Sequence, residues 1–174
     1  QLLDMQEQGI SEAGAYDVKV HDGSTIATAN GTEVISILNG RDFQIVSEIK
    51  VDCDVDALEF ANNGNLIFGC IRGGRSLFLA DLSSGTIEHL LDLPCFRFSA
   101  GITDILKVEE STFAVTSLCG SYQVTLNKSG HELAPLNQNL PERIRPYSAV
   151  QFQDDLFVTT PWDGFLVRAL EDER

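Results

Sequence analysis

Arginine and aromatic residues recur close together at several points of the chain, and they are the side chains best suited to binding a charged partner. An arginine guanidinium binds a carboxylate or phosphate through two parallel hydrogen bonds and stacks on aromatic rings. Tryptophan, tyrosine and arginine also dominate the binding energy of protein interfaces. The pattern predicts recognition of an acidic or phosphorylated peptide by Arg72, Arg75, Phe96, Arg97, Arg143, Arg145, Tyr147 and Trp162. The alternative is that these arginines pair with nearby acids and the rings belong to the core.

Patterns that would indicate catalysis or metal binding are weaker. Residues 52–56 (DCDVD) have the carboxylate density of a calcium loop but lack its glycine and terminal glutamate, so we interpret them as a solvated turn. The three histidines are dispersed, which favours neither a catalytic triad nor a metal site. The glycines of residues 72–75 (RGGR) predict a hairpin turn, because no Gly-Lys-Ser/Thr follows them. We therefore expect no metal, no cofactor and no enzymatic activity.

The charge balance limits the classes of partner. Twelve Lys and Arg residues against 26 Asp and Glu give the 174-residue chain a net charge of −14. Such a surface repels a phosphate backbone, so a nucleic-acid partner is not expected. No apolar run approaches the roughly 20 residues that cross a bilayer, and residues 1–10 do not resemble a targeting segment. The length suits a single domain.

The four cysteines, at positions 53, 70, 95 and 119, lie far apart and form no CxxC pair. This spacing disfavours a zinc site or a redox dithiol. We expect free thiols in a reducing compartment, with disulfides as the alternative, and hence a cytoplasmic or nuclear location. Cys70 and Cys119 are expected to be small core residues.

A repeat of about 44 residues organises the chain. Alternating apolar runs end at Val20, Phe60, Val108 and Phe152, at intervals of 40, 48 and 44 residues, and each is followed by a polar turn and a second run. The expected strands cover residues 17–20, 25–29, 33–38, 44–49, 55–60, 66–70, 76–81, 87–91, 103–108, 112–117, 122–126, 132–136, 148–152, 156–160 and 165–170. A four-strand repeat at a steady interval predicts an all-β chain of propeller blades, with an irregular sandwich as the alternative.

The second repeat resembles the WD-repeat β-propeller family. Residues 60–68 (FANNGNLIF) look like its strand, polar turn and apolar strand, and residues 77–85 (LFLADLSSG) look like a third strand ending at the family's Trp-Asp position, with Asp81 retained. The family's Gly-His dipeptide is absent, so its buried polar network is not expected and the blades should cohere by apolar packing. The resemblance covers nearly the whole chain and implies about 3.75 blades of four antiparallel strands.

Propellers of this family usually have seven blades, so three arrangements remain open: a fragment of a longer propeller, half of a ring completed by a second copy or another subunit, or a closed four-bladed ring. We expect blades at residues 16–51, 55–93, 102–137 and 146–170. Residues 1–15 are expected to be a polar lead-in that could supply a closing strand.

The resemblance implies a non-catalytic platform for protein interaction, a scaffold or adaptor. Strand direction in such a fold places the arginine and aromatic residues on one face. A propeller-type hydrolase with a metal at its central channel would need an acid at the same inner position of several repeats. The corresponding positions are mixed, namely Lys19, Glu59, Lys107 and Gln151. A purely structural subunit, whose blade edges form its interface, is a further alternative.

Overall fold

The computed structural model describes residues 16–70, 74–94, 101–136, 147–152, 155–159 and 166–168. Within them the chain forms fifteen strands in four antiparallel sheets, each built from consecutive strands in sequence order. The first sheet contains β1 (Asp17–His21), β2 (Thr25–Ala29), β3 (Val34–Asn39) and β4 (Ile45–Lys50); the second β5 (Val55–Phe60), β6 (Leu66–Cys70), β7 (Ser76–Ala80) and β8 (Ile87–Asp92). The third contains β9 (Ile102–Lys107), β10 (Thr112–Ser117), β11 (Gly120–Asn127) and β12 (Gly130–Pro135); the fourth β13 (Ser148–Phe152), β14 (Asp155–Thr159) and β15 (Leu166–Arg168).

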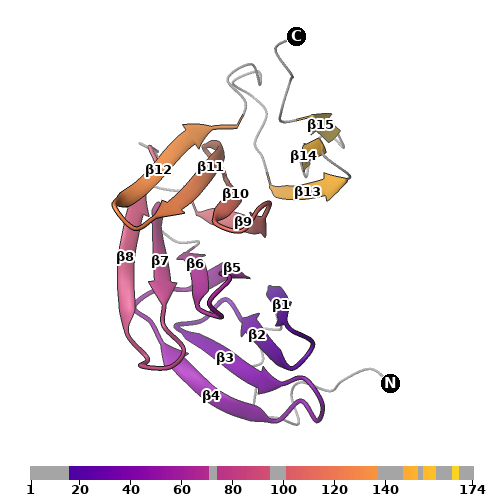
Figure 1. Ribbon diagram of the computed structural model, residues 1–174, viewed down its shortest axis with the longest axis vertical. Coiled ribbons are helices and arrows are strands. Elements are labelled where there is room, and N and C mark those ends of the chain that lie inside the picture. Colours follow the sequence, from indigo (N-terminus) through magenta and orange to yellow (C-terminus); the bar gives the residue numbers. More distant parts are fainter. Residues whose placement is uncertain are drawn as a thin grey trace.

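The four sheets are blades arranged around a common centre. Figure 1 shows the first strands β1, β5, β9 and β13 on the inner side of an arc, with β4, β8 and β12 on its outer side. The described strands form an open arc and not a closed ring (Figure 1). The predicted all-β architecture of propeller blades is therefore confirmed. The predicted lead-in, residues 1–15, lies outside the described residues.

Apolar side chains fill the space between neighbouring blades. A first cluster, which includes Ala27, Ile35, Leu58 and Phe68, joins blades one and two. A second cluster joins blades two and three, and a third joins blades three and four. Three of the four inner strands, β5, β9 and β13, contribute apolar side chains to these clusters. This burial is the main stabilising contribution to the stack, since apolar surface removed from water stabilises by roughly 25 cal/mol per Å².

The turns follow the sequence signals. Gly64 and Gly85, the last residues of the Asn-Asn-Gly and Ser-Ser-Gly turns, have φ of 79° and 71°, a backbone region that favours glycine. The Asp81 carboxylate accepts hydrogen bonds from the Ser83 amide at 2.8 Å and the Ser83 hydroxyl at 2.6 Å. The Ser83 hydroxyl is the main cause of a lowered pKa of Asp81. The retained aspartate of the repeat thus shapes the turn that leads from β7 to β8.

Candidate functional site

One edge of the arc, which we call the link rim, carries the passages between blades and the turns between second and third strands. Because successive strands are antiparallel, the first residues of β1, β5, β9 and β13 and of β7 all lie on this rim. Among the predicted binding residues, Arg75 and Tyr147 are described and lie on the link rim, directly before β7 and β13. The other six, Arg72, Phe96, Arg97, Arg143, Arg145 and Trp162, lie outside the described residues.

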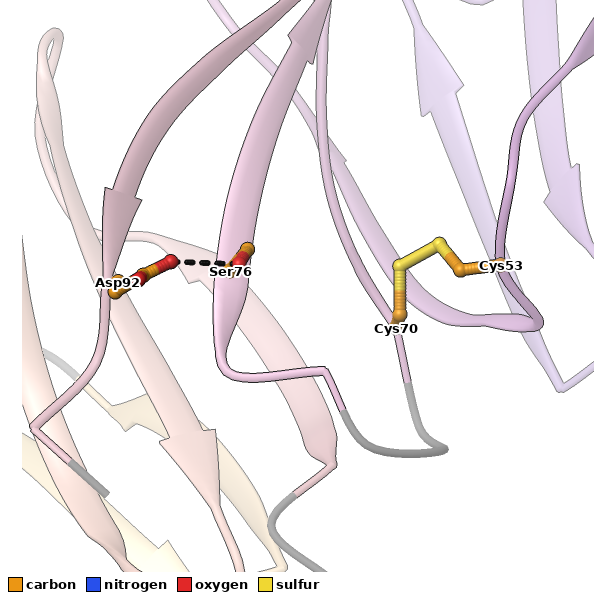
Figure 2. Close-up of a disulfide and its surroundings, with 4 residues drawn as sticks. All are labelled: Cys53, Cys70, Ser76 and Asp92. Atoms are coloured by element: carbon orange, nitrogen blue, oxygen red, sulfur yellow. Dashed lines mark hydrogen bonds between the residues drawn. A yellow bond between two sulfur atoms is a disulfide. The ribbon is translucent and has the colours of Figure 1, made fainter. Parts of the chain in front are cut away.

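Arg75 is held by an acid from the neighbouring strand. Its Nη2 lies 3.4 Å from Asp92 Oδ2, and its side chain stays about half exposed. The Asp92 carboxylate also accepts the Ser76 hydroxyl at 2.6 Å (Figure 2) and lies 3.0 Å from His89 Nε2. The Ser76 hydrogen bond, followed by His89, lowers the pKa of Asp92. The pairing with Asp92 therefore orients the Arg75 guanidinium on the link rim.

Tyr147 belongs to a cavity at the inner end of the link rim. The cavity has a volume of about 240 Å³ and is lined by Tyr16, Asp17, Asp56, Thr103, Asp104, Tyr147 and Ser148. Tyr16 is 61% exposed and Tyr147 51%, so both rings reach solvent. Tyr147 is thus not the core residue of the alternative interpretation, and the inner rim is acidic while Arg75 stands farther from the centre.

A carboxylate joins the inner strands at each of the three blade contacts. Asp17 Oδ2 accepts the amide of Leu58 at 3.0 Å, and Asp104 Oδ2 accepts the amide of Ala149 at 2.9 Å and the hydroxyl of Ser148. Between them, Glu59 Oε2 accepts the amide of Lys107 at 3.3 Å. These bonds satisfy backbone donors on the innermost strands, which have no further strand beside them. Polar contacts therefore accompany the apolar packing that the sequence predicts.

Lys19 connects three of the four blades. Its Nζ donates to the carbonyl oxygen of Ile105 at 3.0 Å and lies 3.5 Å from Glu59 Oε2. Asp17 and Asp104 are slightly farther away, at 3.8 and 3.9 Å. All four side chains are mostly buried. One lysine thus offsets the mutual repulsion of three carboxylates on the inner wall.

The environment of Asp17 opposes its ionisation. Burial raises its pKa above the ordinary 3.8, although the hydrogen bond from the Leu58 amide and the charge of Lys19 act in the opposite direction. A carboxyl group with a raised pKa in the folded chain binds its proton more tightly there than in the unfolded chain. Its contribution to folding stability therefore declines as the pH rises from 3.8 through the raised pKa.

Replacing Asp17 by asparagine should remove this pH dependence while the side-chain carbonyl still accepts the Leu58 amide. We expect the free energy of unfolding of Asp17→Asn, relative to the wild type, to increase as the pH rises from 3.8 through the raised pKa of Asp17. Urea unfolding at several pH values measures this difference. A difference that stays constant or falls with rising pH would contradict the assignment.

A disulfide corrects the expectation of free thiols. Cys53, in the passage from β4 to β5, is bonded to Cys70 at the end of β6, with the two Cα atoms 5.8 Å apart (Figure 2). Cys119 is disulfide-bonded as well. Cys70 does lie in the apolar core, as predicted, but as half of a cross-link between that passage and blade two. The predicted intracellular location loses the argument from free thiols, because disulfides form and persist in oxidising compartments; it stays a prediction.

The described residues hold no group of three or more His, Cys, Asp or Glu side chains that could bind a metal ion. His21, His89 and His131 belong to three different blades, in agreement with their dispersal in the sequence. Nor does the described part of the chain contain a helix that is long and apolar enough to cross a membrane.

Several solved structures resemble the fold of this chain. The Cps50 (Swd1) β-propeller domain of Myceliophteria thermophila matches with a TM-score of 0.63 and 15% identity, over 87% of this chain and 50% of that chain. A chain of a mitotic checkpoint complex matches with a TM-score of 0.64 and 14% identity, over 84% of this chain and 45% of that chain. A computationally designed protein, Ika4, matches with a TM-score of 0.64 and 12% identity, over 91% of both chains. No family model and no curated protein matches the sequence.

These likenesses define the chain as a set of β-propeller blades. The predicted resemblance to WD-repeat propellers is confirmed at the level of the fold. The chain spans about half the length of the two natural chains.

Proposed function

We propose that this chain is a non-catalytic platform for protein interaction, a scaffold or adaptor, and that its link rim recognises an acidic or phosphorylated peptide. The observation that carries the proposal is the half-exposed Arg75 on the outer part of the link rim; the exposed Tyr147 lies on the same rim, nearer the centre. Arginine and tyrosine are residue types that dominate interfaces, and arginine binds carboxylates and phosphates in a bidentate manner. The mitotic checkpoint complex is by its name an assembly, which supports protein partners for such a fold.

Charge placement supports the outer part of the rim as the binding surface. Asp17, Asp56 and Asp104 line the inner cavity and would repel an anionic peptide. Arg75 precedes β7, the third strand from the centre, so an anion bound there avoids the innermost strands. With a net charge of −14, the chain depends on local arginines to attract an acidic segment. The same charge argues for a protein partner over a nucleic acid.

The arginines provide a direct test. We expect the combined change of Arg72, Arg75, Arg97 and Arg145 to alanine to weaken binding of a phosphoserine-containing acidic peptide at least about tenfold, because charged hydrogen bonds are lost. The melting temperature should change little. Fluorescence anisotropy with a labelled peptide, and with its unphosphorylated and uncharged versions, measures the effect.

Arg41→Ala is the matched control, because Arg41 lies in the turn between β3 and β4, on the opposite rim. It should leave peptide binding unchanged. Equal loss in both variants would indicate a non-specific charge effect, and full binding by the combined variant would refute the proposal.

A further inference from the structure

Each contact between neighbouring blades is built in the same way. The first two strands of one blade pack against the first strand of the next: β1 and β2 against β5, β5 and β6 against β9, and β9 and β10 against β13. Every blade therefore has a leading face, on its first two strands, and a trailing face, on its first strand. Three such contacts exist among the described strands, and the trailing face of β1 and the leading face of β13 remain as the two halves of another.

Both remaining halves expose valines. On β1, Asp17 and Lys19 point toward blade two, where they contact Leu58 and Glu59, so Val18 and Val20 point away from it. Val18 is 49% exposed and Val20 61%. On β13, Ala149 is buried in the cluster shared with blade three, so its neighbour Val150 points away from blade three and is 45% exposed.

We propose that two copies of this chain join head to tail, with the leading face of β13 of each copy on the trailing face of β1 of the other. The two new contacts are equivalent and close a ring of twice the four described blades. This arrangement repeats the strand geometry of the existing blade contacts. The chain spans about half the length of the natural propeller chains, and a pair of copies would together hold as many blades as a ring of twice its size. The inference rests on the fold and is independent of the proposed peptide binding.

The new contact differs from the existing ones in its chemistry. The exposed side chains identified on its two faces, Val18, Val20 and Val150, are apolar, whereas each existing contact also has a carboxylate that accepts a backbone amide. Each copy carries a net charge of −14, so the copies repel one another at long range. Salt screens this repulsion, with a Debye length of about 10 Å at 0.1 M, and does not weaken apolar contacts. Association should therefore tighten as salt increases.

Light scattering over a dilution series, at low and high sodium chloride, tests the proposal. We expect a mass of twice 19.1 kDa that persists to lower protein concentration at high salt. Val18→Asp combined with Val20→Asp, or Val150→Asp alone, should raise the dissociation constant at least about a hundredfold, because a charge is then buried against valine. Val46→Asp is the matched control: Val46 is 67% exposed, and it lies on β4, the outermost strand of blade one.

Mixing the two disrupted variants separates head-to-tail pairing from other dimers. One contact in the mixed pair combines an intact β13 with an intact β1, so the mixture should dimerise although neither variant does alone. A mass of 19.1 kDa at every concentration, or a dimer that survives both sets of changes, would overturn the proposal. So would a mixture that stays monomeric. The milder pair Val18→Thr and Val20→Thr, which keeps β-branched side chains, should weaken the dimer at least about tenfold and guards against misfolding.

Discussion

Replacing Lys19 by methionine should lower the free energy of unfolding by about 2–4 kcal/mol, because three carboxylates would then face one another without a cation. Methionine keeps the apolar stem of the side chain, so the loss measures the charge and its hydrogen bond to Ile105. The estimate lies below that for fully buried ion pairs because these side chains retain 14–19% exposure. Urea unfolding at neutral pH measures the change.

Lys128→Met is the control for Lys19, since Lys128 lies exposed in the turn between β11 and β12. It should change stability by no more than about 0.5 kcal/mol. Adding Asp104→Asn to Lys19→Met should restore part of the lost stability, since one repelling charge is removed and the amide oxygen still accepts the Ala149 amide. Equal, small effects of the two lysine changes would show that Lys19 does not hold the blades together.

Removing the Cys53–Cys70 disulfide should cost about 3 kcal/mol and lower the melting temperature by about 6–12 °C. The cross-link joins residues 17 positions apart and restricts the unfolded chain. The expected loss follows from the entropy of closing a loop of that size. Thermal unfolding of the double variant Cys53→Ala/Cys70→Ala, without reductant, measures this bond while Cys119 stays oxidised.

The single variant Cys53→Ala separates the cross-link from packing at Cys70, which is buried beside the first core cluster. It should destabilise almost as much as the double variant. A labelling assay that finds reactive thiols at Cys53 in the folded, unreduced chain would contradict the disulfide, as would a loss of less than about 1 kcal/mol.

The strands could be predicted from the sequence because their signals are local. Alternating apolar residues and turn glycines place β5 and β6 at the expected residues, and β11 and β12 begin two residues before the expected limits. Which carboxylates join neighbouring blades could not be predicted by comparing equivalent positions of the repeats, because the strands are not in the same register in each blade. In β5 the pairing with β6 shifts register between Val55 and Ala57, which changes which residues face the next blade.

Contacts between residues of different blades could not be predicted from the sequence patterns either. Lys19 donates to a carbonyl oxygen 86 residues away, and no spacing rule indicates that distance. The spacing of Cys53 and Cys70 in the sequence does not indicate that they pair. The two residues come together because β6 returns alongside β5. Of the predicted binding residues, Arg75 and Tyr147 lie on one rim. Their placement could be predicted because the repeat in the sequence indicates the order and direction of the strands.

Amide hydrogen exchange at Leu58, Lys107 and Ala149 tests most directly whether this chain is a stack of blades joined at their inner strands. These amides donate to Asp17, Glu59 and Asp104 of the preceding blades and should exchange slowly. Changing Asp17 to alanine should speed exchange at Leu58 and leave Ala149 protected. If all three amides exchange as fast as those of an unprotected strand edge, the blades are not joined in the way described.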